Sequence, residues 1–153
     1  MLVGRHAKRS RDRGSSLVET AAGLLILVPV VLFLFDLVSL IMVQTANDAL
    51  AKHAARAAAE TPNPNPPTST PAAQTQAQTA AQTIVNAFPA SRLAANPTLL
   101  ICDYRDDRVN GVSQVYVRTR LSCTLPIPVP FVGNSGIDFV AEATEPIVAV
   151  LPP

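Results

Sequence analysis

The sequence predicts an α+β protein with a long N-terminal transmembrane helix, a second short helix, and a small antiparallel β-sheet of about three strands. Three observations predict this order. A long apolar stretch follows a basic N-terminal segment, an alanine-rich stretch without glycine or proline extends it, and segments of alternating apolar and polar residues occupy the C-terminal part. The 153 residues therefore divide into a membrane anchor and one small head.

The basic residues are concentrated at the N-terminus. Residues 1–14 hold five Lys and Arg against one Asp, whereas residues 15–153 hold seven basic and ten acidic side chains. Over the whole chain, 12 basic residues nearly balance 11 acidic ones, so no global positive field gathers nucleic acid. We expect residues 1–14 to form a cytoplasmic basic leader, and we expect no nucleic-acid partner.

The apolar stretch Thr20–Val43 is 24 residues long and is interrupted by one charge, Asp36. About 20 residues are enough to span a bilayer. Its Leu, Ile, Val and Phe residues favour insertion by about 7 kcal/mol, against a cost of about 3 kcal/mol for Asp36. Because only Lys52 and Arg56 follow the stretch closely, the positive-inside rule places the N-terminus in the cytoplasm and the later residues outside.

A cleaved secretory signal peptide is the alternative for this stretch. Ala49-Leu50-Ala51 has the small-x-small form of a signal peptidase site, with cleavage after Ala51. However, the apolar stretch exceeds the usual h-region of about 7–15 residues. It also continues into Thr45–Glu60, which is alanine-rich and favours a helix. We therefore expect one helix over residues 15–60, with Pro29 inside it.

A proline-rich segment separates this helix from the head. Residues 61–71 are rich in Pro, Thr, Ser and Asn, a composition that ends a helix and is typical of a linker. The head is expected over residues 72–153. It begins with a second helix over Ala72–Ala87, rich in Ala, Gln and Thr, which Phe88-Pro89 ends.

Three segments of the head predict strands. They are Thr98–Arg105, Gln114–Thr124 and Ile137–Thr144, and a turn signal that includes Asn110-Gly111 separates the first two. In the third, apolar residues alternate with acidic ones, which predicts one buried face. The prolines of 126–130 place that segment at a sheet edge or in a loop.

The two cysteines fall on the apolar faces of the first two strands. A hairpin that pairs residues whose numbers sum to about 225 sets Cys102 opposite Cys123, and the predicted compartment is oxidising. We therefore predict a disulfide that contributes about 3 kcal/mol. Two free buried thiols are the alternative. Neither a CxxC spacing nor a nearby histidine indicates a metal or redox site.

No catalytic constellation stands out. His6 and His53 lie far from cysteines and carboxylates at ligand spacing. Asp103, Asp106 and Asp107 cluster beside arginines near a turn, which is typical of a solvated, charge-compensated turn, with calcium binding as the alternative. No phosphate-binding glycine loop is present. We expect no enzymatic activity, no cofactor and no metal.

The junction of leader and helix reads Arg-Gly-Ser-Ser-Leu-Val-Glu-Thr from Arg13 to Thr20. Glycine, then four small or apolar residues and a glutamate, at the start of a membrane helix, resembles the class III signal of type IV pilins. The resemblance implies that a prepilin peptidase cuts between Gly14 and Ser15. It further implies that Glu19 pairs with the freed α-amine of a neighbouring subunit and sets the assembly register. A capping box at the start of the helix is the alternative for the same residues.

Further residues extend the resemblance to the TadE-like minor pilins of the tight-adherence, or Flp, pilus. These are a prolyl apolar segment at Leu27-Val28-Pro29, the intramembrane acid Asp36, Met42-Val43-Gln44, and the alanine-rich stretch Ala51–Ala58. This sequence has Asp36 where the family has Glu, and methionine where it has an aromatic residue. The match covers roughly residues 9–60.

The resemblance implies a minor pilin, pseudopilin or assembly factor of the bacterial inner membrane, with its head outside and its incorporation into a pilus possible. Its partners would be a prepilin peptidase, other pilin and minor pilin subunits, and the assembly platform in the membrane. The chain has about 93 residues after the helix, more than the short tail of major Flp pilins. A signal-anchored single-pass protein with an unrelated binding or structural head is the main alternative, and a membrane-bound enzyme is a second one.

Overall fold

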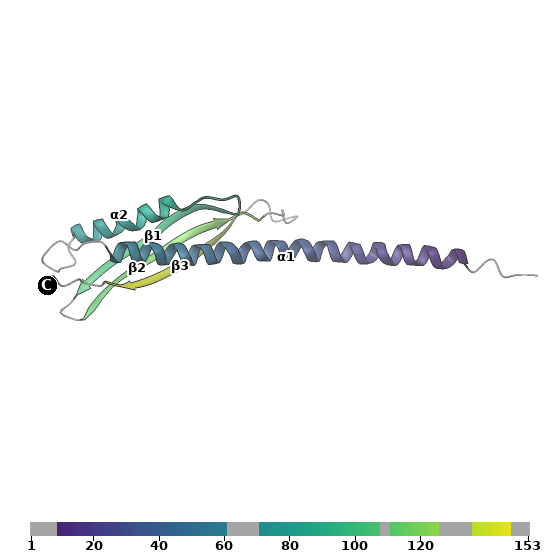
Figure 1. The fold of residues 1–153 in the computed structure, drawn as a ribbon, viewed down its shortest axis with the longest axis horizontal. Helices are drawn as coiled ribbons and strands as arrows, with labels where there is room; N and C mark the ends of the chain where they lie inside the picture. Colours follow the sequence, from purple (N-terminus) through teal and green to yellow (C-terminus); the bar gives the residue numbers. More distant parts are fainter. Residues whose placement is uncertain (1–8, 61–70, 108–110, 126–135, 148–153) are drawn as a thin grey trace, which may run out of the picture. The chain divides into compact units, whose positions relative to one another are not determined.

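The computed structural model describes residues 9–60, 71–107, 111–125 and 136–147. The elements follow in the order α1 (Arg9–Ala59), α2 (Pro71–Ala87), β1 (Ala94–Asp107), β2 (Val112–Cys123) and β3 (Ile137–Pro146) (Figure 1). This order confirms the predicted α+β fold. Most of the predicted linker and the proline-rich 126–130 lie outside the described residues. Internal contacts divide the chain into two units, residues 1–38 and 39–153.

Helix α1 begins earlier than expected, at Arg9 instead of residue 15. No strong helix breaker stands between Arg9 and Arg13, and a single internal glycine such as Gly14 costs only about 1 kcal/mol. Pro29 lies inside the helix, as predicted. Within the described residues, one helix is long and apolar enough to cross a membrane, the Ser16–Ala59 part of α1. Its large apolar side chains are exposed, for example Leu25 at 76% and Phe33 at 67%.

In the second unit, one side of the C-terminal turns of α1 and one side of α2 are buried, and the residues on these sides are mainly small. Alanine gives a helix a smooth surface, so other elements can approach it closely. The buried residues of α1 and of α2 each form a stripe along one side of the helix, and both stripes belong to one core cluster with the sheet. The fully or almost fully buried members are Leu50, Ala51, Ala54, Ala55 and Ala58 of α1, and Ala73, Ala77, Ala81 and Val85 of α2.

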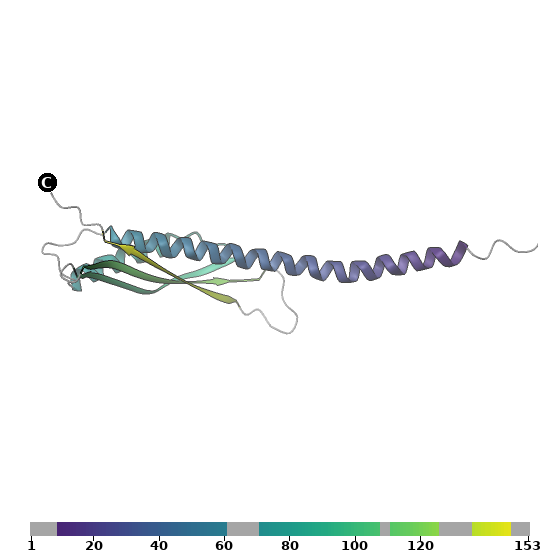
Figure 2. The ribbon, with the colours of Figure 1, turned by 90° about the horizontal axis from the view of Figure 1, so that it is seen from below.

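The three strands form one antiparallel sheet in the order β1-β2-β3. Both helices cover the same face of the sheet (Figures 1 and 2). α2 lies beside β1, and the C-terminal turns of α1 from Val43 to Ala59, here called its outer turns, lie along β2 and β3. The covered face carries the buried side chains Tyr104, Val115, Val117, Ala141 and Ala143. This confirms the predicted alternation in the strands, including the third.

The predicted register of the hairpin is wrong, and so is the pairing of the cysteines. Cys102 lies opposite Val117, and Cys123 lies opposite Ala94. Six residues of β2 therefore separate Cys123 from the position opposite Cys102, about 20 Å along a strand. A disulfide requires Cα atoms within about 7 Å. No disulfide joins the two cysteines; Cys123 is buried and Cys102 is half-buried, which agrees with the alternative of two buried thiols.

The turn fixes the partner of Cys102. Asp107 lies opposite Val112, and no shift occurs between this pair and Cys102, so Cys102 lies opposite Val117. Two irregularities follow further along β1. The pairing of β1 with β2 shifts between Ala95 and Thr98 and again between Leu99 and Ile101. Asn96, which precedes a proline, adopts a left-handed backbone conformation with φ of 52°, as Asn does more readily than most residues. The resulting bulges displace the N-terminal half of β1 relative to its partner, so they change which residue lies opposite Cys123 but not the partner of Cys102.

Candidate functional site

The residues of the predicted processing motif lie within α1. Gly14 and Ser15 are helical, and the side chain of Glu19 is exposed. Because α1 begins at Arg9, Ser16 is an interior residue of the helix and the capping-box interpretation is wrong. Ser16 instead accepts, through its carbonyl, a 2.8 Å hydrogen bond from Thr20 Oγ1.

Asp36 differs from its neighbours on the same helix. Its residue is 9% exposed, whereas Phe35 and Leu37 on either side are 61% and 41% exposed. Glu19 and Asp36 are 17 positions apart in α1, about 25 Å along a helix. The structure therefore does not bring the two predicted acidic residues together.

A buried polar contact fixes the outer turns of α1 to the sheet. Asn47 is 1% exposed, and its Oδ1 accepts a 2.9 Å hydrogen bond from Thr119 Oγ1 in β2. Its Nδ2 donates a 2.9 Å bond to the carbonyl of Phe139 in β3. Sequence analysis missed Asn47, although it is the one polar side chain in the buried stripe that runs from Val43 to Ala58.

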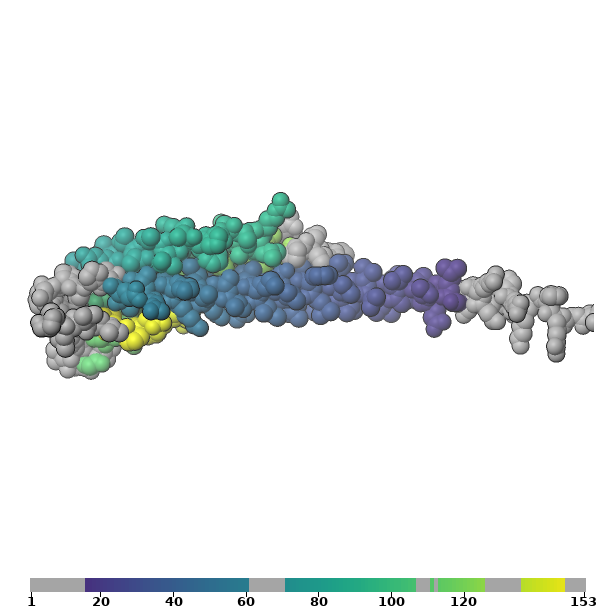
Figure 3. Space-filling view, in the orientation of Figure 1, coloured from purple at the N-terminus to yellow at the C-terminus, as the bar shows by residue number. Residues whose placement is uncertain are grey.

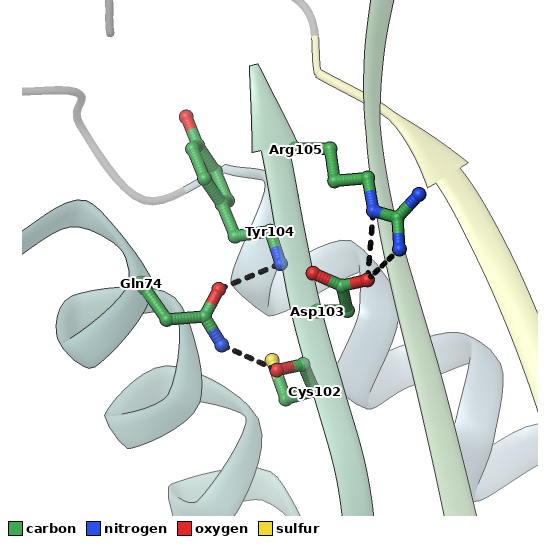
Figure 4. Close-up of polar contacts among 5 residues, drawn as sticks. All are labelled: Gln74, Cys102, Asp103, Tyr104 and Arg105. Carbon is green, nitrogen blue, oxygen red and sulfur yellow. Dashed lines mark hydrogen bonds and ion pairs between the residues drawn. The ribbon is translucent and has the colours of Figure 1, made fainter. Parts of the chain in front are cut away.

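A second side-chain amide occupies the edge of the sheet. β1 is an edge strand, and Gln74 of α2 lies beside it (Figure 4). Gln74 Nε2 donates to the carbonyl of Cys102, and Gln74 Oε1 accepts a 2.7 Å bond from the amide of Tyr104. The carboxamide thus satisfies the outward backbone groups of β1 as a neighbouring strand would.

An open groove runs between the outer turns of α1 and the end of α2, which lie side by side (Figure 3). Its volume is about 500 Å³ and its lining is mainly apolar. The α1 side includes Ala46, Ala49 and Ala57, and the opposite side includes Ile84 of α2 and Phe88, which directly follows α2. Part of the α1 side belongs to the alanine-rich stretch Ala51–Ala58, but sequence analysis gave no signal that these residues line a groove.

Charged residues stand at one end of the groove. Arg56 and Glu60, which both line it, form an ion pair of 2.9 Å, and the bond to Glu60 raises the pKa of Arg56. The pair is exposed, so its contribution to stability is small. His53, the second of the two histidines considered in the sequence, is also exposed and lines the groove.

The acidic cluster near the β1–β2 turn divides into two environments. Asp103 forms an ion pair with Arg105 at 2.7 Å, in agreement with a compensated turn. Asp106 is buried and its Oδ1 accepts a 2.7 Å bond from Ser113 Oγ. Among the residues that the structure describes, no group of three His, Cys, Asp or Glu side chains could hold a metal ion.

The outer face of the sheet pairs charges across strands. Arg118 and Glu142 are direct partners in the register and lie 3.2 Å apart, and Arg120 lies 3.6 Å from Asp138. Desolvation and a hydrogen bond to Glu142 raise the pKa of Tyr116 on the same face. In these pairs, positive and negative charges balance each other, so they give this face no excess of either sign.

Comparison with protein-family models, curated proteins and solved structures finds no match to this chain.

Proposed function

We propose that this chain is a minor pilin, pseudopilin or assembly factor of a tight-adherence pilus, anchored in the bacterial inner membrane by α1 and processed between Gly14 and Ser15. The observation that carries the proposal is the Gly14–Glu19 motif at the start of the apolar part of α1, which is long enough to span a membrane. A prepilin peptidase, other pilin subunits and the assembly platform are the proposed partners.

The exposure of α1 supports the membrane part of this proposal. Large apolar side chains from Leu17 to Met42 are exposed around the helix, which is unfavourable in water and favourable in lipid. Pro29 is compatible with this environment, because membrane helices tolerate proline.

The attachment of the head supports the subunit part. The same helix that carries the motif continues into the second unit, where its alanine stripe and Asn47 pack on the sheet. The C-terminal turns of α1 therefore belong to the packed head.

The test is the N-terminus of the mature chain. The full chain is expressed in a bacterial host with and without a prepilin peptidase of the tight-adherence type, and intact mass and terminal sequencing identify its first residue. We expect Ser15 as the first residue only when the peptidase is present. A chain that starts at Lys52 would show ordinary secretion, and Met1 retained in both conditions would show a plain membrane anchor; either result contradicts the proposal.

Two variants of the leader sharpen this test. Gly14→Leu should leave the leader attached, because the peptidase of the proposed class requires a small residue before the cut. Gly4→Leu introduces the same side chain into the same leader and should be processed as the wild type is. Equal processing of both variants would show that the cut, if any, lies elsewhere.

The assembly role of Glu19 needs a separate measurement. Glu19→Gln should still be cut but should be lost from the sheared pilus fraction, because the neutral amide cannot pair with an α-amine in an apolar bundle. Asp48→Asn changes an exposed acid of the same helix and serves as the control. If Glu19→Gln enters pili as well as the control does, the register role is wrong.

A further inference from the structure

The groove beside α1 has the spacing of a helix-binding surface. Its α1 residues include positions 46, 49, 53, 56, 57 and 60, which recur every three or four residues and so form one stripe along the helix. α2 supplies the opposite wall with Ile84, and Phe88, the residue after α2, extends this wall. Such a pair of walls is the form in which an apolar groove receives a helix.

The size of the lining residues favours a close approach. Ala46, Ala49 and Ala57 project only methyl groups, so a second helix can reach the short interaxial distances of about 8 Å that small residues permit. Ala49 is exposed, and Ala46 and Ala57 are half-buried. The stripe is therefore accessible to another helix.

The charges of the groove are self-complementary. Arg56 and Glu60 are of opposite sign and four residues apart at one end of the stripe. Two parallel copies of this stripe can exchange partners, with Arg56 of each copy facing Glu60 of the other, so neither like charges nor unpaired charges are required. A single-signed stripe would repel a second copy.

We propose that this groove, formed by α1 from Ala46 to Glu60 and by the end of α2, receives the same stretch of α1 from a second copy of this chain. Two copies anchored in one membrane have parallel α1 helices and a high local concentration, which favours a two-fold symmetric, isologous contact. The inference rests on the membrane anchoring of α1 in the proposed function, and not on processing at Gly14 or on a pilus.

Site-directed cross-linking of the full chain in membranes tests this contact. Ala49→Cys places a thiol in the groove, whereas Lys52→Cys places one on the same helix, three residues further on, at an exposed position outside the groove. With a short bismaleimide at low expression, Ala49→Cys should give severalfold more dimer than Lys52→Cys. The wild-type chain measures the background from Cys102 and Cys123.

The identity of the cross-linked product decides the occupant. Two differently tagged copies should appear in one product of twice the chain mass. Equal yields from Ala49→Cys and Lys52→Cys, or a product that contains another protein, would overturn the proposal. The experiment is done without a prepilin peptidase, so the contact can fail while processing at Gly14 succeeds, and the reverse.

A groove-filling variant keeps the test independent of the thiol position. Ala49→Phe should strongly reduce the cross-linking of Ala57→Cys, while Lys52→Phe should leave it unchanged. The thermal unfolding midpoint of each variant measures whether the head is folded. We expect it to be unchanged, because residues 49 and 52 are both exposed. Unchanged cross-linking in the folded Ala49→Phe variant would also overturn the proposal.

Discussion

Thr119 Oγ1 donates a 2.9 Å hydrogen bond to Asn47 Oδ1, and both side chains are buried. The same carboxamide donates to the carbonyl of Phe139, so one residue of α1 contacts two adjacent strands. A rotation or shift of the helix would leave these polar groups buried without partners, at a cost of about 1–3 kcal/mol for each. Asn47 therefore sets the position of the outer turns of α1 on the sheet.

Replacement of Asn47 should destabilise the head. We expect Asn47→Leu to lower the free energy of unfolding by about 1–3 kcal/mol, because the Thr119 hydroxyl and the Phe139 carbonyl lose a buried partner. Denaturant unfolding of the full chain in detergent measures the change. Asp48→Leu, at the exposed neighbouring position, should change it much less.

A second substitution separates the hydrogen bond from packing. Thr119→Val should recover part of the stability of Asn47→Leu, because replacing both polar partners removes the unsatisfied hydroxyl. Additive losses in the double variant would show that the bond has no role in fixing the helix.

The edge of β1 provides a more local prediction. Gln74→Ala removes the side chain that accepts from the Tyr104 amide, so hydrogen exchange at Tyr104 should become faster, with a stability loss of about 1 kcal/mol. Gln78→Ala changes the same residue type one turn later on α2, where the side chain is exposed. Residue-resolved exchange that is equally fast in both variants would contradict the role of Gln74 at the edge.

Local patterns predicted the elements but not the contacts between them. The Ala, Gln and Thr content of Ala72–Ala87 and the alternation in β3 are properties of short segments, and they gave the second helix and the third strand. The partners of Asn47 lie 72 and 92 positions away in the chain. No local pattern identifies such a pair, because it depends on how α1 lies on the finished sheet.

The same distinction applies to the candidate site. The Gly14–Glu19 motif is a contiguous segment and was found from the sequence alone. The groove combines residues near position 50 with residues near position 86, and its alanines are of a kind that a helix uses equally in a core. The cysteine pairing failed because it depends on where the turn closes the hairpin. Asp107 pairs with Val112, and this register sets Cys102 opposite Val117.

Both cysteines should remain reduced and unreactive in the folded chain. Burial raises the pKa of the Cys102 thiol to about 11, and the charge of Asp103 adds to this shift. Since the thiolate is the reactive form, only about one thiol in a thousand is ionised at pH 8. Alkylation of Cys102 should be slow there and should rise about tenfold for each pH unit up to pH 10.

The sign of the shift also fixes the effect of pH on stability. A thiol whose pKa is raised by folding stabilises the folded state fully below its ordinary pKa, and this contribution is lost as the pH rises toward 11. Intact mass after alkylation of folded and denatured chain measures both thiols. Loss of two hydrogens from the folded, non-alkylated chain would reveal a disulfide and contradict the register of β1 and β2.

In the outer turns of α1, a larger side chain should be tolerated in place of an exposed alanine but not in place of a buried one. Ala54 is fully buried between the helices and the sheet, whereas Ala49, five residues earlier, is exposed in the groove. Ala54→Leu adds three carbon atoms to a packed core and should lower the free energy of unfolding by about 1–3 kcal/mol. Ala49→Leu makes the same chemical change without a core to overfill, so its unfolding midpoint in detergent micelles at high dilution should match that of the wild type. If Ala54→Leu is also neutral, the outer turns of α1 are not packed against the sheet as the core cluster indicates.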